Sequence, residues 1–75
     1  MISYQLSASR NIKLTIYNLL GQEVRMLINS FQSAGKHSVT WNARDNANNP
    51  VCSGIYLYKM EAGDRSFQKK MIFVR

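Results

Sequence analysis

The sequence has few of the residues that build disulfides, metal sites and acid–base centres. Its 75 residues include one cysteine, one histidine and four carboxylates. A single cysteine forms no internal disulfide, which excludes a disulfide-stapled scaffold. We expect Cys52 to be a small buried side chain, and its presence leaves the redox compartment open.

Long hydrophobic runs are also missing. No stretch approaches the roughly 20 apolar residues that a membrane helix needs, so we expect no membrane insertion. The first residues lack the basic start and unbroken apolar core of a secretory signal. The chain therefore either stays in the cytosol or is part of a larger protein with a signal upstream. A strand-like pattern that begins at residue 2 favours the second interpretation.

The few reactive side chains are not spaced for catalysis or for cofactor binding. A catalytic site needs a nucleophile beside a base, paired carboxylates, or metal ligands. There is no Gly-rich phosphate loop and no zinc spacing, and the segment DNANN lacks the closing glutamate of a calcium loop. His37 and Cys52 would act together only if the fold brought them into contact. We expect no enzymatic activity, no metal and no cofactor.

Acidic residues are scarce, and the formal net charge is +6. The basic residues are scattered along the chain, and only Lys69 and Lys70 are adjacent. Nucleic-acid binding requires exposed aromatic and basic residues on one sheet. Tyr56 and Tyr58 beside Lys59 could be arranged so, but aromatic residues at alternate strand positions are more often core. We therefore expect no nucleic acid, and some attraction to acidic glycans or lipids.

The most frequent pattern in the sequence is the alternation of apolar and polar residues, which predicts strands. The predicted strands cover residues 2–6, 12–17, 23–28, 36–42, 55–62 and 66–74. A helix over residues 19–28 is the alternative for the third of these, and Gly21 near its start argues against it. Met26 and Leu27 compete for one inward position in that strand.

Turn residues separate the strands at short intervals. Gly21 predicts one tight hairpin, and Gly63-Asp64 predicts the last. Residues 29–38 are predicted as a loop with Phe31 under the sheet, and residues 43–50 as turns rich in Asn and Asp. The last hairpin is apolar on both faces, which predicts strands central to a sheet. Truncation of the final strand should then unfold the protein.

Together these patterns predict an all-β fold in a single domain, residues 1–75. Six to seven short strands with regular turns are typical of a small antiparallel β-sandwich. A chain of this length buries only about 60% of its unfolded surface, so we expect modest stability.

Four ordered blocks of the sequence resemble a known family. They are ISYQL, LTIYNLLGQEV, AGKHSVTWN, and SGIYLYKM with KKMI, and they span almost the whole chain. They resemble the type A C-terminal sorting domain of the type IX (Por) secretion system, and the related Ig-like domain of flagellar hook-capping proteins. Ser7 stands where the sorting family often has proline, in an exposed link. The resemblance implies an Ig-like or fibronectin III-like sandwich without catalytic activity.

For a sorting domain, the resemblance further implies a secreted or cell-surface cargo upstream that passes through the periplasm and across the outer membrane. The implied partners are an outer-membrane translocon and a sortase-like peptidase. The open alternative is a structural Ig-like spacer or assembly module, as in hook-capping proteins or beside a glycan-degrading catalytic domain. An exposed edge strand could also pair with a second copy.

We expect any partner to be recognised by the final hairpin, through strand addition and charge contacts. The candidate recognition residues are Gly54, Tyr56, Tyr58, Lys69, Lys70 and Arg75. Each has a simpler explanation. Glycine suits a turn or a bulge, tyrosine suits packing, and the lysines could protect an edge strand from aggregation.

Overall fold

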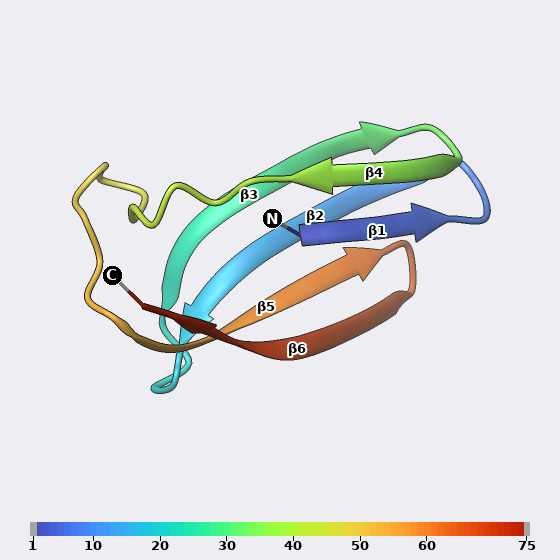
Figure 1. Ribbon diagram of the computed structural model, residues 1–75. Coiled ribbons are helices and arrows are strands. Elements are labelled where there is room, and N and C mark those ends of the chain that lie inside the picture. The colour runs from blue at the N-terminus through green and yellow to red at the C-terminus, as the bar shows by residue number, and fades with distance from the viewer. Residues whose placement is uncertain (1, 75) are drawn as a thin grey trace.

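The computed structural model describes residues 2–74, which form six strands (Figure 1). The strands are β1 (Ile2–Leu6), β2 (Arg10–Asn18), β3 (Glu23–Gln32), β4 (Gly35–Val39), β5 (Gly54–Ala62) and β6 (Arg65–Phe73). All described strand pairings are antiparallel. The prediction of an all-β antiparallel fold is confirmed, with six strands.

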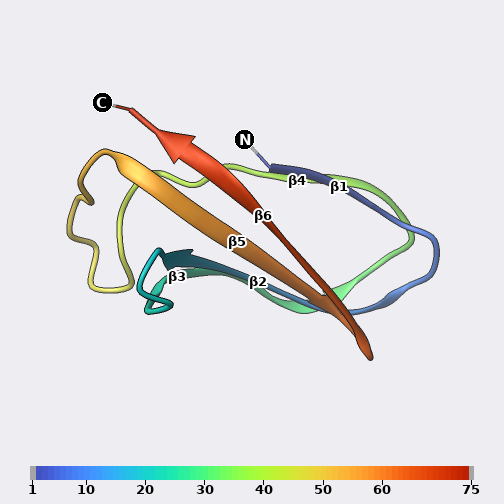
Figure 2. The ribbon, with the colours of Figure 1, turned by 90° about the horizontal axis from the view of Figure 1, so that it is seen from below.

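The strands form two sheets. β1 pairs with β4, and a four-stranded sheet has the order β3-β2-β5-β6. Figure 2 shows β1 and β4 in one layer, β2 and β3 in the facing layer, and β5 and β6 crossing diagonally beside them. The strong twist of the larger sheet produces this diagonal course. The small sheet therefore covers only part of the larger one.

The core lies between the layers and is built mainly from β2. Ile12, Leu14 and Ile16 alternate along this strand, and each is at most 1% exposed. Met60 of β5 pairs with Leu14 and is also buried, and Leu6 of β1 closes the core from the other sheet. Alternation at period two places these side chains on one face. Their burial supplies most of the hydrophobic stabilisation.

The turn between β2 and β3 is organised by Asn18. Its Oδ1 accepts hydrogen bonds from the backbone N–H groups of Leu20 (2.9 Å) and Gln22 (3.0 Å). Gly21 has φ +81°, a left-handed conformation that glycine adopts without steric cost. The predicted hairpin is confirmed, and the helical alternative for residues 19–28 is wrong.

β3 is longer than predicted and has two irregularities in its pairing with β2. One lies where Leu14 pairs with Ile28 and Thr15 with Met26, so that Leu27 is the extra residue. A bulge lets consecutive residues avoid strict alternation. Leu27 and Ile28 thus both pack toward the core, which resolves the competition between Met26 and Leu27 in favour of Leu27.

Two details of the middle segment differ from prediction. Residues 29–32 are strand, because they pair with β2, whereas we predicted a loop, and β4 begins at Gly35, one residue before the predicted strand 36–42. Phe31 is 65% exposed and does not lie under the sheet. In the other direction, β4 ends at Val39, three residues earlier than the predicted strand.

The loop after β4 contacts the first part of the outer edge of β3. The Asp45 carboxylate accepts hydrogen bonds from the N–H groups of Ala47 and Asn49, as its turn-forming character predicts. The turn directs Asn46 at β3: its N–H donates to the Val24 carbonyl (2.9 Å), and its Oδ1 accepts from the Met26 N–H (3.0 Å). One asparagine therefore bonds to the β3 edge as a neighbouring strand would.

β6 forms the opposite edge of the same sheet. It pairs with β5 from Gly54–Phe73 to Ala62–Arg65 and with no other described strand. The prediction that both strands of the last hairpin are central is therefore wrong for β6 and right for β5. Of the apolar side chains of β6, Met71 and Phe73 pack against the core, whereas Phe67 is 50% exposed and Ile72 is 72% exposed.

Candidate interaction surface

Tyr56 is a core residue. It is 8% exposed, and its ring packs edge-on against Trp41 with centroids 5.2 Å apart. Its hydroxyl donates to the Cys52 carbonyl at 2.6 Å, which satisfies the one polar atom of the side chain. Recognition by Tyr56 remains untested, but its contacts are those of packing.

Tyr58 and Gly54 lie on the same strand with different surroundings. Tyr58 is partly buried and packs against the core on the face that Tyr56 shares. Gly54 pairs with Phe73 where β5 begins, and a Cβ placed there would meet nothing within 4 Å. Gly54 does not have a positive φ, so its backbone conformation does not require the glycine of a turn or a bulge.

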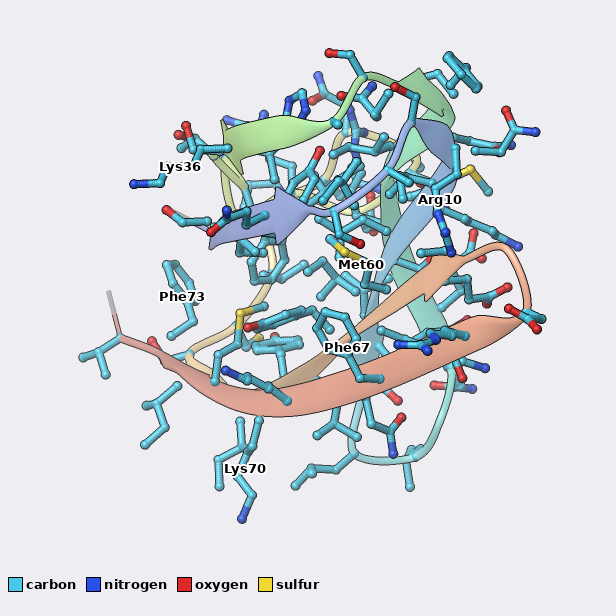
Figure 3. The ribbon with its side chains drawn as sticks, turned by 90° about the vertical axis from the view of Figure 1, so that its right-hand side faces the viewer. Arg10, Lys36, Met60, Phe67, Lys70 and Phe73 are labelled. Carbon is cyan, nitrogen blue, oxygen red and sulfur yellow. The ribbon has the colours of Figure 1, made fainter. Side chains whose placement is uncertain are left out.

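Lys69 and Lys70 are exposed but do not form one basic patch. Adjacent residues of a strand point to opposite faces. Lys69 pairs with Tyr58 on the inward face, and Lys70 pairs with Leu57 on the outer face. In Figure 3, Lys70 extends from β6 on the side opposite to Phe67. Arg75, the last candidate residue, lies outside the described residues.

The same separation applies to the aromatic and basic residues considered for nucleic acid. Tyr56 and Tyr58 face the core, whereas Lys59 lies on the opposite face of β5. Lys59 forms an ion pair with Glu61 at 3.7 Å on that outer face. Tyr58 and Lys59 therefore do not share a surface.

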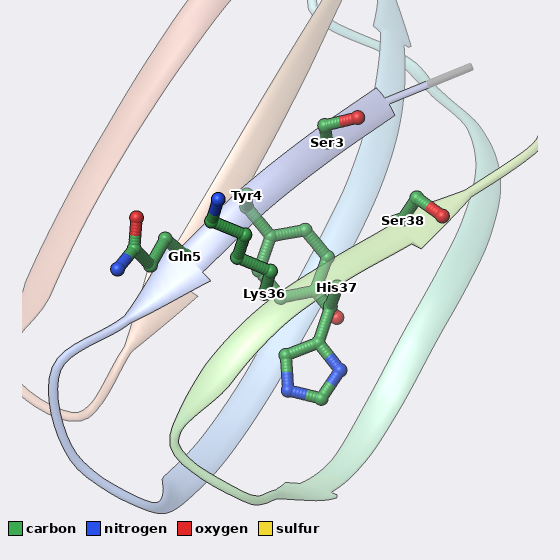
Figure 4. A pocket seen from close by; sticks show the side chains of 6 residues that line it. All are labelled: Ser3, Tyr4, Gln5, Lys36, His37 and Ser38. Atoms are coloured by element: carbon green, nitrogen blue, oxygen red, sulfur yellow. The ribbon is translucent and has the colours of Figure 1, made fainter.

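A shallow pocket lies on the two-stranded sheet, over β1 and β4 (Figure 4). The Tyr4 and His37 rings stack there with centroids 5.3 Å apart, and a His37 ring nitrogen lies 2.7 Å from the Ser33 carbonyl oxygen. Burial raises the pKa of the Tyr4 phenol above its ordinary value of 10.0. The imidazole is thus held by a ring and a carbonyl.

Two further pockets lie between β1 and β6, and together they are called the β1–β6 cleft here. The larger has a volume of about 490 Å³ and is lined by residues that include Leu6, Arg10, Met60, Asp64, Arg65 and Phe67. The smaller, about 290 Å³, is lined by residues that include Ile2 and Phe73. In Figure 3, Phe67 and Phe73 rise from β6 toward this cleft. Sequence reasoning missed it, because alternation assigns Phe67 to a face but not what covers that face.

The reactive side chains can be placed individually. Cys52 is exposed in the loop before β5, so the prediction that it is buried is wrong. Its carbonyl, rather than its thiol, makes the contact with Tyr56. Within residues 2–74, no three His, Cys, Asp or Glu side chains gather where they could hold a metal. The same residues contain no helix of the length and apolar character that a membrane crossing requires.

Comparison with known families identifies the domain. The family model described as the FlgD Ig-like domain matches residues 2–66, which spans all of the described strands up to the start of β6. Searches of the curated proteins and of the solved structures gave no significant match. The match confirms the predicted resemblance to hook-capping proteins, while the sorting-domain resemblance stays a prediction. The chain belongs to the FlgD Ig-like domain family.

Proposed function

We propose that the chain is a non-catalytic Ig-like module with a structural role, which positions or assembles the parts of a larger protein that acts outside the cytoplasm. The observation that carries the proposal is the family match over residues 2–66 of a chain that folds as a two-sheet sandwich. The description of that family names an Ig-like fold and no activity.

The packing of the aromatic residues supports a structural role. Trp41 contacts Tyr56 edge-on and Phe73 at 5.9 Å between ring centroids, and so joins the loop after β4 to both strands of the last hairpin. The Trp41 Nε1–H donates to the Arg44 carbonyl (2.9 Å), which fixes the ring. These contacts make the loop and the hairpin one body, as a rigid module requires.

Replacement of the module tests the proposal. In the intact protein that carries it, residues 1–75 are exchanged for an unrelated Ig-like sandwich of similar size. A structural module predicts that assembly of the protein is retained, whereas Leu14→Asp, which unfolds the native module, abolishes it. Loss of assembly with a folded replacement would contradict a purely structural role.

A sorting role is the second candidate, and the exposure of Lys69 and Lys70 on the last strand favours it. In that case the module directs a cargo through the type IX translocon, and the sortase-like peptidase acts on it at the cell surface. Fusion of residues 1–75 behind a periplasmic reporter, in a bacterium with type IX machinery, separates the two candidates. Reporter outside the cell supports sorting, and reporter retained in the periplasm supports the structural module.

A further inference from the structure

The two edge strands of the larger sheet, β3 and β6, differ in regularity and in their hydrogen bonding on the outer side. The β3 edge carries two irregularities, and Asn46 forms hydrogen bonds with Val24 and Met26 near its start, so an incoming strand meets occupied groups in that part of the edge. β6 pairs over all nine residues with β5, and within residues 2–74 no hydrogen bond joins its other edge to the rest of the chain. It has no proline, no glycine and no bulge in its pairing. A regular free edge of this length is a template for strand addition.

The β1–β6 cleft lies directly beside this edge. Phe67 is 50% exposed on the cleft side of β6, and Met71, on the same face, is partly buried. The larger of its two pockets lies at the β5–β6 hairpin end, where Asp64 and Arg65 line it, and the smaller lies toward the end of β6. In Figure 2 the β6 ribbon diverges from β1 toward that hairpin. A strand added to β6 would direct alternate side chains over Phe67 and Met71, and so complete the cover of the core.

The charges along the edge identify the chemistry of the occupant. Lys69 on the cleft face and Lys70 on the outer face stand side by side in the middle of β6, and Arg65 stands at its start. Within the described residues the one ion pair is Lys59 with Glu61, so these three cations have no carboxylate partner. A carboxylate directly opposite a lysine stabilises strand pairing, and a cation opposite it opposes pairing.

We propose that the β6 edge and the β1–β6 cleft bind an extended segment of a partner protein with two adjacent carboxylates between apolar residues. In antiparallel register the two carboxylates meet Lys69 and Lys70. The apolar residues meet Phe67 on one side of the pair, and Met71 and Ile72 on the other. A second copy of this chain is the wrong occupant, because each copy has a net charge of +6. The inference goes beyond the proposed function and holds for a structural module and for a sorting domain alike.

A designed peptide tests the inference. The labelled probe VVVEETVT places its two glutamates opposite the lysines, and its binding to the 75-residue chain is followed by fluorescence anisotropy. Saturable binding is expected, with at least a tenfold loss when the glutamates are replaced by lysine. A peptide with proline in place of the central threonine should also bind at least tenfold more weakly, because proline cannot donate to a strand pairing.

Matched protein variants separate strand addition from general attraction to a basic protein. Lys69→Glu and Lys70→Glu should each weaken binding at least fivefold, whereas Lys36→Glu, an equal charge change on the exposed face of β4, should change it less than twofold. Circular dichroism of each variant establishes that it is folded. Backbone amide shifts in β6 should accompany peptide binding, with little change in β3.

Three outcomes of the peptide experiments would overturn the inference. They are no saturable binding of the probe to the folded chain, equal loss in the Lys36→Glu variant, and amide shifts located on β3 instead of β6. Self-association of the chain through β6, measured by sedimentation, would also overturn it, since the occupant would then be a second copy. Failure of the peptide test would leave the proposed structural function standing, because the module-replacement experiment that tests that function does not use the peptide.

Discussion

At the scale of the residue, Asn46 shows how one side chain can close a sheet edge. Its amide bonds to the Met26 N–H and to the Glu23 carboxylate, in addition to its own backbone bond to Val24. The sequence marks Asn46 only as a turn residue, because nothing local reveals that the loop folds back onto β3. Such a contact between residues 20 positions apart becomes visible only in the folded chain.

Asn46→Ala should lower the free energy of unfolding by about 1 kcal/mol, because two side-chain hydrogen bonds at an exposed position are lost. Asn49→Ala is the control: its backbone N–H bonds to Asp45, and alanine keeps that bond. Urea unfolding of both variants measures the difference. Equal stabilities of the two variants would show that Asn46 does not hold the edge.

Leu14→Ala should destabilise the protein by roughly 2–5 kcal/mol, because a fully buried side chain at the centre of the core leaves a cavity. A domain of this size has a total stability of roughly 4–11 kcal/mol, so the loss is a large share of it. Leu20→Ala removes the same atoms from a side chain that is 83% exposed and should cost less than about 0.5 kcal/mol. Thermal denaturation of the pair checks both values, and similar costs would contradict the assignment of the core.

The Tyr4 phenol should make stability depend on alkaline pH. Its pKa is raised in the folded state by burial, so the folded protein keeps this proton to higher pH than the unfolded chain does. This contribution to stability is fully present below pH 10 and is lost as pH rises through the raised pKa. Tyr4→Phe should flatten the decline, measured as melting temperature between pH 9 and 11. An unchanged slope in the variant would remove Tyr4 as its source.

At the scale of the element, the positions of most strands could be predicted from the sequence, but the order in which the strands pair could not. Period-two alternation located β1, β2, β5 and β6 within a few residues, because each has one face in the core. The pattern failed for residues 29–32, where Phe31 is exposed although it is aromatic. Apolar residues on both faces of β6 suggested a central strand, but pairing order is a property of tertiary packing. The β1–β6 cleft could not be predicted for the same reason, because it depends on how the two sheets pack.

Gly21 in the β2–β3 turn and Gly54 at the start of β5 differ in backbone conformation. Gly21→Ala should cost about 1–2 kcal/mol, because alanine is strained at φ +81° although a Cβ there meets nothing within 4 Å. Gly54→Ala meets nothing either and has no positive φ, so it should be close to neutral. Chemical denaturation compares the two. A large cost at Gly54 would mean that the start of β5 is tighter than described.

At the scale of the whole molecule, the protein is a sandwich whose larger sheet has two unequal edges. The sandwich and the family resemblance to hook-capping domains could be predicted from the sequence, because they depend on alternation and ordered blocks. The sequence could not show that Lys69 and Lys70 lie on an edge strand or that the Tyr56 ring packs against Trp41. Both depend on how the strands and the loop after β4 are arranged in the fold. The asymmetry between β3 and β6 is therefore the central structural claim.

Hydrogen exchange of the backbone amides tests this asymmetry most directly. In the free 75-residue chain, amides of β6 that point away from β5 should exchange rapidly, in alternation with protected ones, while the Met26 amide on the opposite edge is protected by Asn46. Uniform protection along β6, or rapid exchange at Met26, would contradict the account.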